Sequence, residues 1–302
     1  MEPIKVTFLG TCGSTPQKGK NFASTVISFR GDSLLFDCPE GTQKQLMVSD
    51  HSLMGINNVF ISHMHADHFL GLFGWISTMT LNQRKERLTI FSPEGGKEKI
   101  SKMLKEVVRP SFEIEYKELK KGTALKGEFY DIYSFPLKHE IPCFGLVFKE
   151  KDKVGEFNRK KAEELGIPPG PLYSKLATGG KVKVKGKTFT QKDVMDYSKK
   201  RDGRKVVIVS DTRVLKELPE EARKADLLIH EATFLETQKE KAIEALHSTA
   251  LEGAQLAKKS GAKKLALFHF SARNTDEAEI KAEAEKEFKG AIIAKEMETI
   301  IL

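Results

Sequence analysis

Three histidines and one aspartate lie within six positions of the stretch ISHMHADHFL, residues 61–70. Neutral imidazole and carboxylate groups are suitable ligands for Zn²⁺ and similar divalent ions. Asp67 alone would more often cap a helix, and the histidines alone would more often be polar loop residues. Four such groups at this spacing instead predict a metal site formed by His63, His65, Asp67 and His68.

Further potential ligands follow other apolar stretches of the chain. His139 follows IYSFPL, Asp211 follows KVVIVS, and His269 follows KLALF. Each of these three residues alone would be an ordinary residue at the end of a strand. Together with the first four they complete two sets of metal ligands, and Asp211 could bridge the two ions. The predicted sets are His63, His65 and His139 for one ion, and Asp67, His68 and His269 for the other. Two ions about 3.5–4 Å apart suit phosphate-ester hydrolysis, because water held between them becomes a nucleophile near neutral pH.

The elements that must position these residues alternate in a layered α/β pattern. Strand-length apolar runs are KVTFLG, TVISF, SLLFD, NVFIS, LTIF, KVVIVSD, DLLIHEA and KLALFHF. Helical periodicity marks residues 67–80, 94–107, 213–224, 248–260 and 276–287. If the strand beginning at NVFIS persists to His65, the side chains of His63 and His65 point to the same side. We expect an α/β fold with sheet packed against sheet or helix, and the chemistry where strands end.

Composition indicates a globular chain of 302 residues, which is one large domain or two ordinary ones. The N-terminus enters a strand pattern at once, so we expect no signal peptide, and no apolar run approaches the about 18 residues of a membrane span. The three cysteines are far apart, which argues against a disulfide framework and predicts a cytoplasmic location. His51 has no partner pattern, and we expect it at the surface.

The net charge of +8 is concentrated in one segment. From Lys149 to Lys205 there are 17 Lys and Arg residues against 8 Asp and Glu, a net of +9, so the rest of the chain sums to −1. A localised excess suggests a polyanionic partner, with nucleic acid the first candidate. A solvated, lysine-rich surface is the alternative, and charge alone does not decide between them.

The same segment, residues 150–204, interrupts the alternation of strands and helices. It contains the helical stretch GEFNRKKAEELG, then PPGP, then GGKVKVKGK. The prolines exclude a continuous helix or central strand, and the alternation in KVKVK places all its lysines on one face. We interpret this segment as an inserted hairpin or protruding arm, not a second folded domain, because it holds few large apolar residues. It is called the insertion below.

HMHADH is an H-x-H-x-D-H motif, and with the later His, Asp and His it resembles the metallo-β-lactamase superfamily. The resemblance implies an αβ/βα sandwich with two zinc ions at one edge. It thus implies one catalytic domain over residues 1–302, with a basic arm inserted at about 150–204. The superfamily hydrolyses β-lactams, thioesters, lactones and phosphodiesters, so the fold alone does not give the substrate.

Further distinctive stretches of the chain are FLGTCGSTPQKGKN, LLFDCPEGTQKQL, HEATF, HST and HFSAR. Together they resemble ribonuclease Z, the endonuclease that trims the 3′ trailer from precursor tRNA. The Pro-x-Lys-x-Arg-Asn loop of that family appears here with Lys18, Lys20 and Asn21, so lysine replaces the arginine. The lysine keeps the positive charge, but it cannot bind a phosphate through two parallel hydrogen bonds as an arginine does. Arg273 would clamp a phosphate, with a plain surface arginine as the alternative.

The ribonuclease Z resemblance also implies roles for four other residues. Gly170 and Pro171 match the tip of an arm that grips the tRNA body. Glu231 and His247 match a pair in which the carboxylate orients the histidine as a general acid for the leaving oxygen. From the residues alone, a structural hydrogen bond near a helix start is the alternative for His247. Asp67 would both bind metal and orient the attacking water.

The implied activity is cleavage of precursor tRNA after the discriminator nucleotide, leaving a tRNA 3′-OH and a 5′-phosphorylated trailer. The implied cofactors are two Zn²⁺ per subunit, with Mn²⁺ or another divalent ion as alternatives, and the implied assembly is a homodimer. One rival is a broader phosphodiesterase of the same superfamily, against which the arm argues, since a small substrate needs no distant grip. The other is a non-catalytic RNA-binding module, against which the complete ligand set argues.

Overall fold

The computed structural model describes residues 2–274 and 276–302, and the chain forms two compact units. The core unit combines the residues up to Lys149 with those from Lys205 onward, and the insertion runs from Glu150 to Arg204. Within the described ranges, no helix is long and apolar enough to cross a membrane.

Two seven-stranded sheets form the centre of the core unit. The first contains, in spatial order, β20 (Thr299–Ile301), β1 (Lys5–Gly10), β3 (Ser24–Phe29), β4 (Asp32–Phe36), β5 (Asn58–Phe60), β6 (Leu88–Ser92) and β7 (Ile114–Glu118). The second contains β19 (Ile292–Ile293), β17 (Leu265–Phe268), β16 (Leu227–Glu231), β15 (Lys205–Val209), β10 (Phe144–Glu150), β9 (Tyr130–Pro136) and β8 (Gly122–Lys126). Each of the eight apolar runs predicted as strands forms one of these strands, so those predictions are confirmed.

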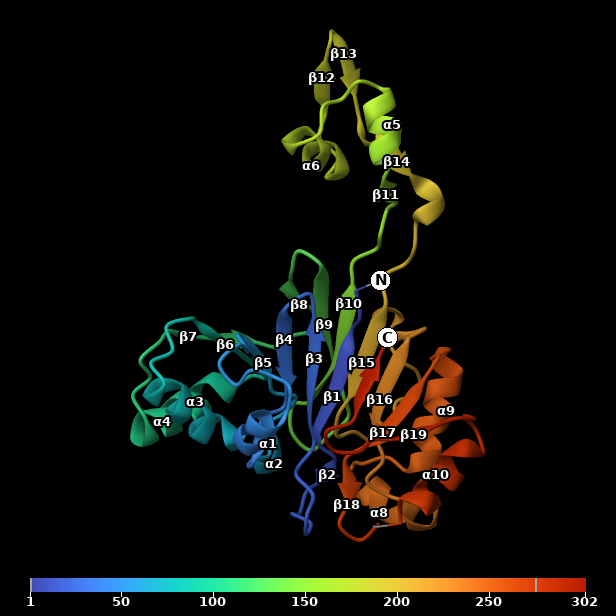
Figure 1. Ribbon diagram of the computed structural model, residues 1–302. Coiled ribbons are helices and arrows are strands. Elements are labelled where there is room, and N and C mark those ends of the chain that lie inside the picture. The colour runs from blue at the N-terminus through green and yellow to red at the C-terminus, as the bar shows by residue number, and fades with distance from the viewer. Residues whose placement is uncertain (1, 275) are drawn as a thin grey trace. The chain divides into compact units, whose positions relative to one another are not determined.

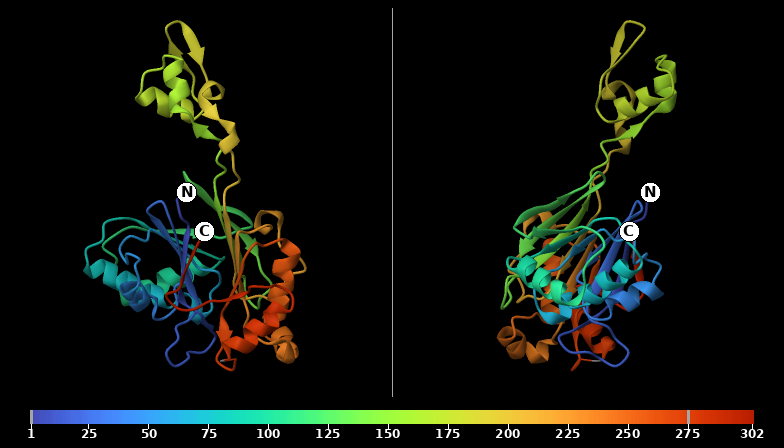
Figure 2. Two further views of the ribbon diagram at one scale, coloured as in Figure 1. Left: turned by 45° about the vertical axis from the view of Figure 1, so that its right-hand side comes forward. Right: turned by 90° about the vertical axis from the view of Figure 1, so that its left-hand side faces the viewer.

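The two sheets pack face to face, and helices cover both outer faces (Figures 1 and 2). Apolar side chains of both sheets share one core, in which Phe60 stacks on Phe36 and Phe91 at centroid distances of 5.3 and 4.3 Å. The first sheet is covered by α1 (Thr42–Val48), α3 (Gly71–Leu81) and α4 (Gly96–Val107). The second is covered by α9 (Ala250–Ser260) and α10 (Glu277–Glu285). The predicted αβ/βα sandwich is confirmed.

Parallel strands in both sheets bring their carboxyl ends to one region of the core unit. In the first sheet β4, β5, β6 and β7 run parallel, and in the second β15, β16, β17 and β19 do. Ligands in open α/β sheets bind beyond such carboxyl ends. Short elements complete this region: β2 (Cys12–Gly13) pairs with β18 (Phe270–Ser271), and α2 (Ala66–Phe69) follows β5. Further along lie η2 (Glu220–Ala222), η3 (Glu236–Gln238) and α8 (Lys239–Glu244).

The insertion has its own small apolar cluster of six buried residues: Ala162, Ile167, Leu176, Val182, Phe189 and Val194. Its elements are β11 (Glu156–Phe157), α5 (Arg159–Glu164), α6 (Pro171–Ala177), β12 (Val182–Val184), β13 (Lys187–Phe189), α7 (Gln191–Val194), β14 (Met195–Asp196) and η1 (Tyr197–Lys199). The hairpin predicted from KVKVK is confirmed, since β12 pairs with β13 and Lys181, Lys183 and Lys185 are exposed. At the base of the insertion, Glu150 pairs with Arg201 and Arg204 at 2.6 and 2.8 Å.

Four local predictions fail for identifiable reasons. The helix expected at 213–224 is wrong, because Pro219 interrupts the segment and only the short η2 forms there. The helix expected at 67–80 is instead two helices, α2 and α3, that meet at Leu70. The strand does not persist to His65, which is the N-cap residue of α2. His51 is half-buried, not at the surface, and its ring nitrogens lie 2.9 and 3.2 Å from the hydroxyls of Thr7 and Ser28.

Candidate active site

The seven predicted ligands converge at the carboxyl ends of the strands. The described residues include two groups whose ligand atoms all lie within 4.8 Å of one another and that match the two predicted sets. They are His63, His65 and His139, and Asp67, His68 and His269. Asp211 joins His63 and His68 in a further group of this kind.

In the first group, three imidazole nitrogens face one point. His65 Nδ1 lies 3.1 Å from His63 Nε2 and 3.2 Å from His139 Nε2. In a tetrahedral zinc site with bonds of about 2.0–2.1 Å, neighbouring ligands lie about 3.3 Å apart. The spacing of these three nitrogens therefore fits one such ion.

In the second group, two buried imidazole nitrogens have no hydrogen-bond partner among the residues that the structure describes. They are the Nε2 atoms of His68 and His269, which lie 3.7 and 3.9 Å from Asp67 Oδ2. A buried polar atom without a partner is costly, so two of them aimed at one carboxylate call for a cation. Asp67 lies in the first turn of α2 without acting as its N-cap, and its Oδ2 accepts a hydrogen bond from the backbone N–H of Ser14 at 2.8 Å.

Asp211 lies between the two groups and presents one oxygen to each. Its Oδ2 lies 3.8 Å from His63 Nε2. Its Oδ1 lies 3.6 Å from His68 Nε2 and 3.1 Å from His269 Nε2. This is the arrangement expected of a carboxylate that bridges two ions.

An unusual backbone conformation and a close contact with Gly13 place the ring of His269 in the second group. His269 follows β17 and has a positive φ of 60°, which turns its ring away from the strand direction. The ring lies directly against Gly13, where an added Cβ would come within 2.2 Å of it. Gly13, in the stretch FLGTCGST, is therefore required for the close approach of the β2 backbone to the site.

Asp37, which sequence reasoning did not single out, orients the second group. Its Oδ2 accepts a hydrogen bond from His68 Nδ1 at 2.8 Å, and its Oδ1 accepts one from the backbone N–H of Ser62 at 2.7 Å. The bond at Nδ1 leaves His68 Nε2 free to face an ion. The signal was present in the sequence, since Asp37 ends the run SLLFD just as Asp211 ends KVVIVSD.

Glu231 and His247 form a buried pair beside the ligands. His247 Nδ1 donates to Glu231 Oε1 at 2.9 Å, and the same oxygen accepts the backbone N–H groups of Thr212 and Ser248 at 3.0 and 3.1 Å. The other ring nitrogen of His247 lies 3.9 Å from Asp211 Oδ2. Glu231 thus holds the ring with one edge toward the bridging carboxylate.

Two further residues that the sequence did not reveal hold this pair in place. Thr233 Oγ1 donates to Glu231 Oε2 at 2.7 Å and lies 3.0 Å from His269 Nδ1, so it links the pair to the second ligand group. Arg213 donates to the carbonyl oxygen of His247 at 2.6 Å and pairs with Glu252. Neither residue stands in a ligand-like pattern, which is why spacing alone did not indicate them.

Burial and neighbouring carboxylates shift the pKa values of several of the imidazoles. Burial disfavours a charged imidazole and lowers the pKa of His63, His139 and His269, which suits neutral ligands. Burial also opposes protonation of His247, but the carboxylates of Glu231 and Asp211 outweigh it and raise the pKa of His247 to about 9.

The pKa values of the carboxyl groups of Asp211 and Glu231 are lowered. Burial alone would raise the pKa of Asp211, yet the imidazoles of His269 and His68 hold it well below its ordinary value. Burial likewise opposes ionisation of Glu231, but His247 lowers the pKa of its carboxyl group.

The predicted substrate residues are placed outside the ligand groups. Lys20 forms a 2.9 Å ion pair with Glu277, and the Asn21 side chain donates to Glu296 at 2.9 Å. Lys18 and Arg273 are exposed. Gly170 is the N-cap residue of α6 in the insertion, and Pro171 is the first residue of that helix.

Several curated relatives of this chain carry the same name. The protein called Ribonuclease Z of Archaeoglobus fulgidus is 43% identical over 97% of this chain and 96% of its own length. The Ribonuclease Z of Methanosarcina acetivorans is 41% identical, again over 97% of this chain and 96% of its own. The chain belongs to the ribonuclease Z family. The resemblance seen in HEATF, HST and the N-terminal stretches is confirmed.

Solved structures agree with membership of the ribonuclease Z family. Human tRNase Z, short form, is 27% identical with a TM-score of 0.69 over 98% of both chains. The metallo-β-lactamase fold protein YhfI of Bacillus subtilis is 19% identical with a TM-score of 0.72 over both full chains, which shows the fold alone. Residues 4–151 also match the family described as Anti-Pycsar protein Apyc1. The ribonuclease Z family and this fold imply a dinuclear metal site, which the two ligand groups fit.

Proposed function

We propose that the protein is a metal-dependent endoribonuclease that removes the 3′ trailer from precursor tRNA. The observation that carries this is the paired ligand groups joined by Asp211, next to the Glu231–His247 pair, in a chain of the ribonuclease Z family. Cleavage after the discriminator nucleotide would leave a 3′-OH on the tRNA and a 5′-phosphate on the trailer.

The proposed cofactors are two Zn²⁺ ions per subunit, with Mn²⁺ or another divalent ion as alternatives. The residues that would hold them are His63, His65, Asp67, His68, His139, Asp211 and His269. When bound, the ions supply Lewis acidity at the scissile phosphate and lower the pKa of a water molecule. Histidine and carboxylate donors suit zinc, and burial keeps several of these imidazoles neutral.

His247 is the proposed proton donor for the leaving 3′ oxygen. It lies beside the bridging Asp211, and the carboxylate of Glu231 fixes its other ring nitrogen. A proton at Nδ1 is held in the bond to Glu231, so the proton at Nε2 is the one available to substrate. Asp67 is proposed to orient the attacking water in addition to binding metal.

Lys18, Lys20, Asn21 and Arg273 are proposed to contact phosphates near the acceptor end. The backbone N–H of Ser14 bonds to Asp67, so this N-terminal loop already touches the ligand cluster. The partly exposed ion pair of Lys20 with Glu277 is worth only about 0–1 kcal/mol. Exchanging Glu277 for a phosphate would therefore cost little.

The insertion is proposed to hold the body of the tRNA, with Gly170 and Pro171 at its tip. Its lysines give it a local positive charge, and phosphate contacts supply much of the affinity of proteins for RNA. It would act as a binding arm within a single catalytic domain, since it carries none of the predicted metal ligands. The three buried free cysteines suit a cytoplasmic location.

A homodimer is proposed from an exposed apolar surface on the core unit. Met47 and Val48 at the end of α1 are 69% and 66% exposed. Met47 and Leu70 also line a cavity of about 610 Å³ between α1 and the start of α3. Exposed apolar groups in one patch mark an interaction site, and a second copy of this chain would cover it.

The deciding experiment is incubation with a trailer-bearing precursor tRNA and zinc, followed by mapping of both RNA ends. The expected products are a tRNA ending in 3′-OH and a 5′-phosphorylated trailer. No cleavage with zinc bound would show a non-catalytic RNA-binding module. Equal preference for precursor tRNA and small model diesters would show a broader phosphodiesterase.

A further inference from the structure

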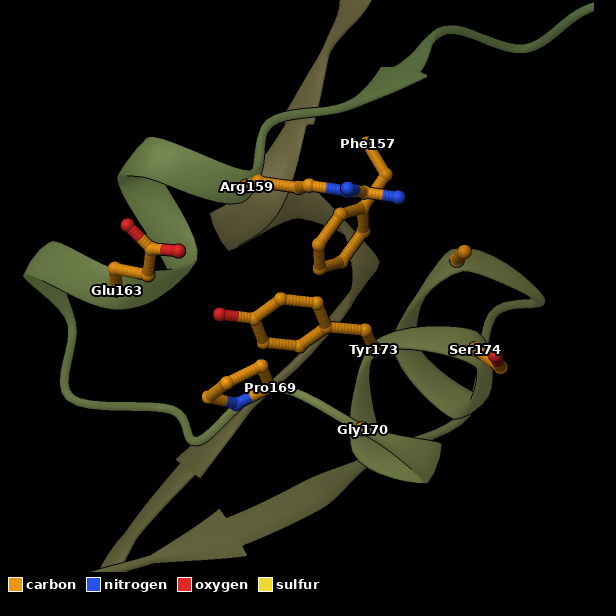
Figure 3. A pocket seen from close by; sticks show the side chains of 8 residues that line it. Phe157, Arg159, Glu163, Pro169, Gly170, Tyr173 and Ser174 are labelled. Atoms are coloured by element: carbon orange, nitrogen blue, oxygen red, sulfur yellow. The ribbon is translucent and has the colours of Figure 1, made fainter.

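A pocket of about 500 Å³ lies entirely within the insertion. Figure 3 shows it from close by, with Phe157 and Tyr173 facing each other inside it. The lining comes from the end of β11, from α5, from the Pro169–Gly170 turn and from α6. This volume lies within the range of small-molecule sites, which is about 300–1,000 Å³.

The two aromatic rings are held in fixed positions. Their centroids are 4.8 Å apart at an interplanar angle of 41°, and both side chains pack against the apolar cluster of the insertion. The hydroxyl of Tyr173 donates to the carbonyl oxygen of Ile167 at 3.2 Å. Gly170 closes the turn with a φ of +131°, a conformation that other residues rarely adopt. Rings held in this way lose little freedom when they bind a ligand.

The polar groups of the pocket decide what ligand suits it. Arg159 and Glu163 lie one turn apart on α5, and both line the pocket with Ser174. A site for phosphate alone would not include the carboxylate of Glu163, which repels anions. A nucleobase, in contrast, has an apolar face for the rings and amino groups that donate to a carboxylate. Arg159 can then stack on the base or bind the adjoining phosphate.

We propose that this pocket captures one unstacked nucleobase of the RNA substrate, and that Glu163 selects an amino-bearing base over uracil. The inference rests on the proposed function and deepens it. The exposed lysines of the insertion would attract any RNA, whereas the pocket would fix one unpaired nucleotide and hence the register of the bound RNA.

The test begins with binding of precursor tRNAs that carry a single abasic substitution at each unpaired position in turn. One position is expected to weaken binding to the unaltered protein by about 5- to 100-fold, the range for base–aromatic stacking. The same substitution should have little further effect on Tyr173→Leu, which already lacks the ring. Tyr173→Phe keeps the ring and should bind like the unaltered protein. Tyr197→Leu is the matched control, because Tyr197 is 42% exposed on the same insertion but does not line the pocket.

A second set of precursor tRNAs carries uracil at the position where the abasic substitution weakens binding. The unaltered protein should prefer an amino-bearing base there, and Glu163→Gln should lose that preference. The inference is overturned if no unpaired abasic position weakens binding to the unaltered protein. It is also overturned if the abasic penalty is undiminished in Tyr173→Leu, or if uracil binds equally well. Cleavage of intact precursor tRNA is followed in parallel, so failure of the proposed function is seen separately as a lack of cleavage.

Discussion

The metal-ligand cluster and the insertion hold their polar side chains in opposite ways. In the cluster, His63, His68 and His269 are buried, and the Nδ1 atom of each lies within hydrogen-bond distance of a polar side chain outside the ligand set. In the insertion, the lysines of the β12–β13 hairpin are mostly exposed, over an apolar cluster of only six residues. Chemistry requires atoms at fixed positions, whereas attraction of RNA requires only a field of one sign. Changes in the cluster should therefore affect cleavage of every substrate, and changes in the insertion should affect only RNA.

The largest effect is expected from loss of the metal ions. Chelation, or Asp211→Asn, should reduce cleavage of precursor tRNA and of a small chromogenic diester by more than the about 10²–10⁴-fold that a lost proton donor costs. The reason is that Asp211 presents one oxygen to each ligand group. Metal content and both rates are measured, with the exposed Asp50→Asn as the control. Full activity on either substrate after complete metal removal would contradict the dinuclear site.

The next effect is expected from His247→Ala, which should lower kcat on precursor tRNA by about 10²–10⁴-fold. Bound metal and KM should change little, because the proposed role of His247 is proton transfer and not metal binding. Steady-state kinetics together with metal analysis separate these two roles. His51→Ala serves as the control, since His51 bonds to Thr7 and Ser28 outside the ligand groups. A loss of metal in His247→Ala would make this residue a ligand instead.

A smaller effect is expected from Asp37→Asn, which should weaken metal binding by about 10–100-fold. Asp37 fixes His68 through a 2.8 Å hydrogen bond without itself belonging to either ligand group. Zinc titration with a competing chelator measures the change. Asp32→Asn is the matched control, because Asp32 begins β4, the strand that Asp37 follows, and accepts a hydrogen bond from Tyr130. Equal zinc affinity in both variants would show that Asp37 does not orient His68 for metal binding.

The smallest effect concerns the base of the insertion. Burial opposes ionisation of Glu150, but Arg201 and Arg204 outweigh it and hold the pKa of its carboxyl group well below 4.5. A lowered carboxyl pKa contributes stability that is present above the unfolded-state value of about 4.3 and is lost as pH falls below it. Protection of the insertion against hydrogen exchange, taken relative to the intrinsic exchange rate at each pH, should therefore fall from about pH 4 downward.

At neutral pH, Glu150→Gln should destabilise the insertion by about 1–2 kcal/mol, because it removes charge-assisted hydrogen bonds to two arginines. Glu156→Gln is the control, since Glu156 is exposed and its side chain lies a longer 3.5 Å from that of Lys153. Identical exchange in the two variants would show that the arginine pairs do not stabilise the base of the insertion.

The sequence predicted which residues meet more completely than it predicted the local backbone. His63, His139 and Asp211 follow apolar strands, and parallel strands carry such residues to a common edge, so their meeting could be expected. Pro219 broke a periodic helix pattern, and the strand into the motif ended early, because the backbone N–H of Ser62 bonds to Asp37. Contacts of that kind join residues distant in the sequence, and periodicity contains no information about them.

The most direct test of the division between cluster and insertion replaces Lys181, Lys183, Lys185 and Lys187 with glutamine. These residues belong to the β12–β13 hairpin region and include none of the predicted metal ligands. The kcat/KM for precursor tRNA should fall, and its dependence on salt should weaken by about one unit of slope for each phosphate that the lysines no longer neutralise. The rate on the chromogenic diester should stay unchanged. Equal loss on both substrates, or no loss on precursor tRNA, would contradict the account.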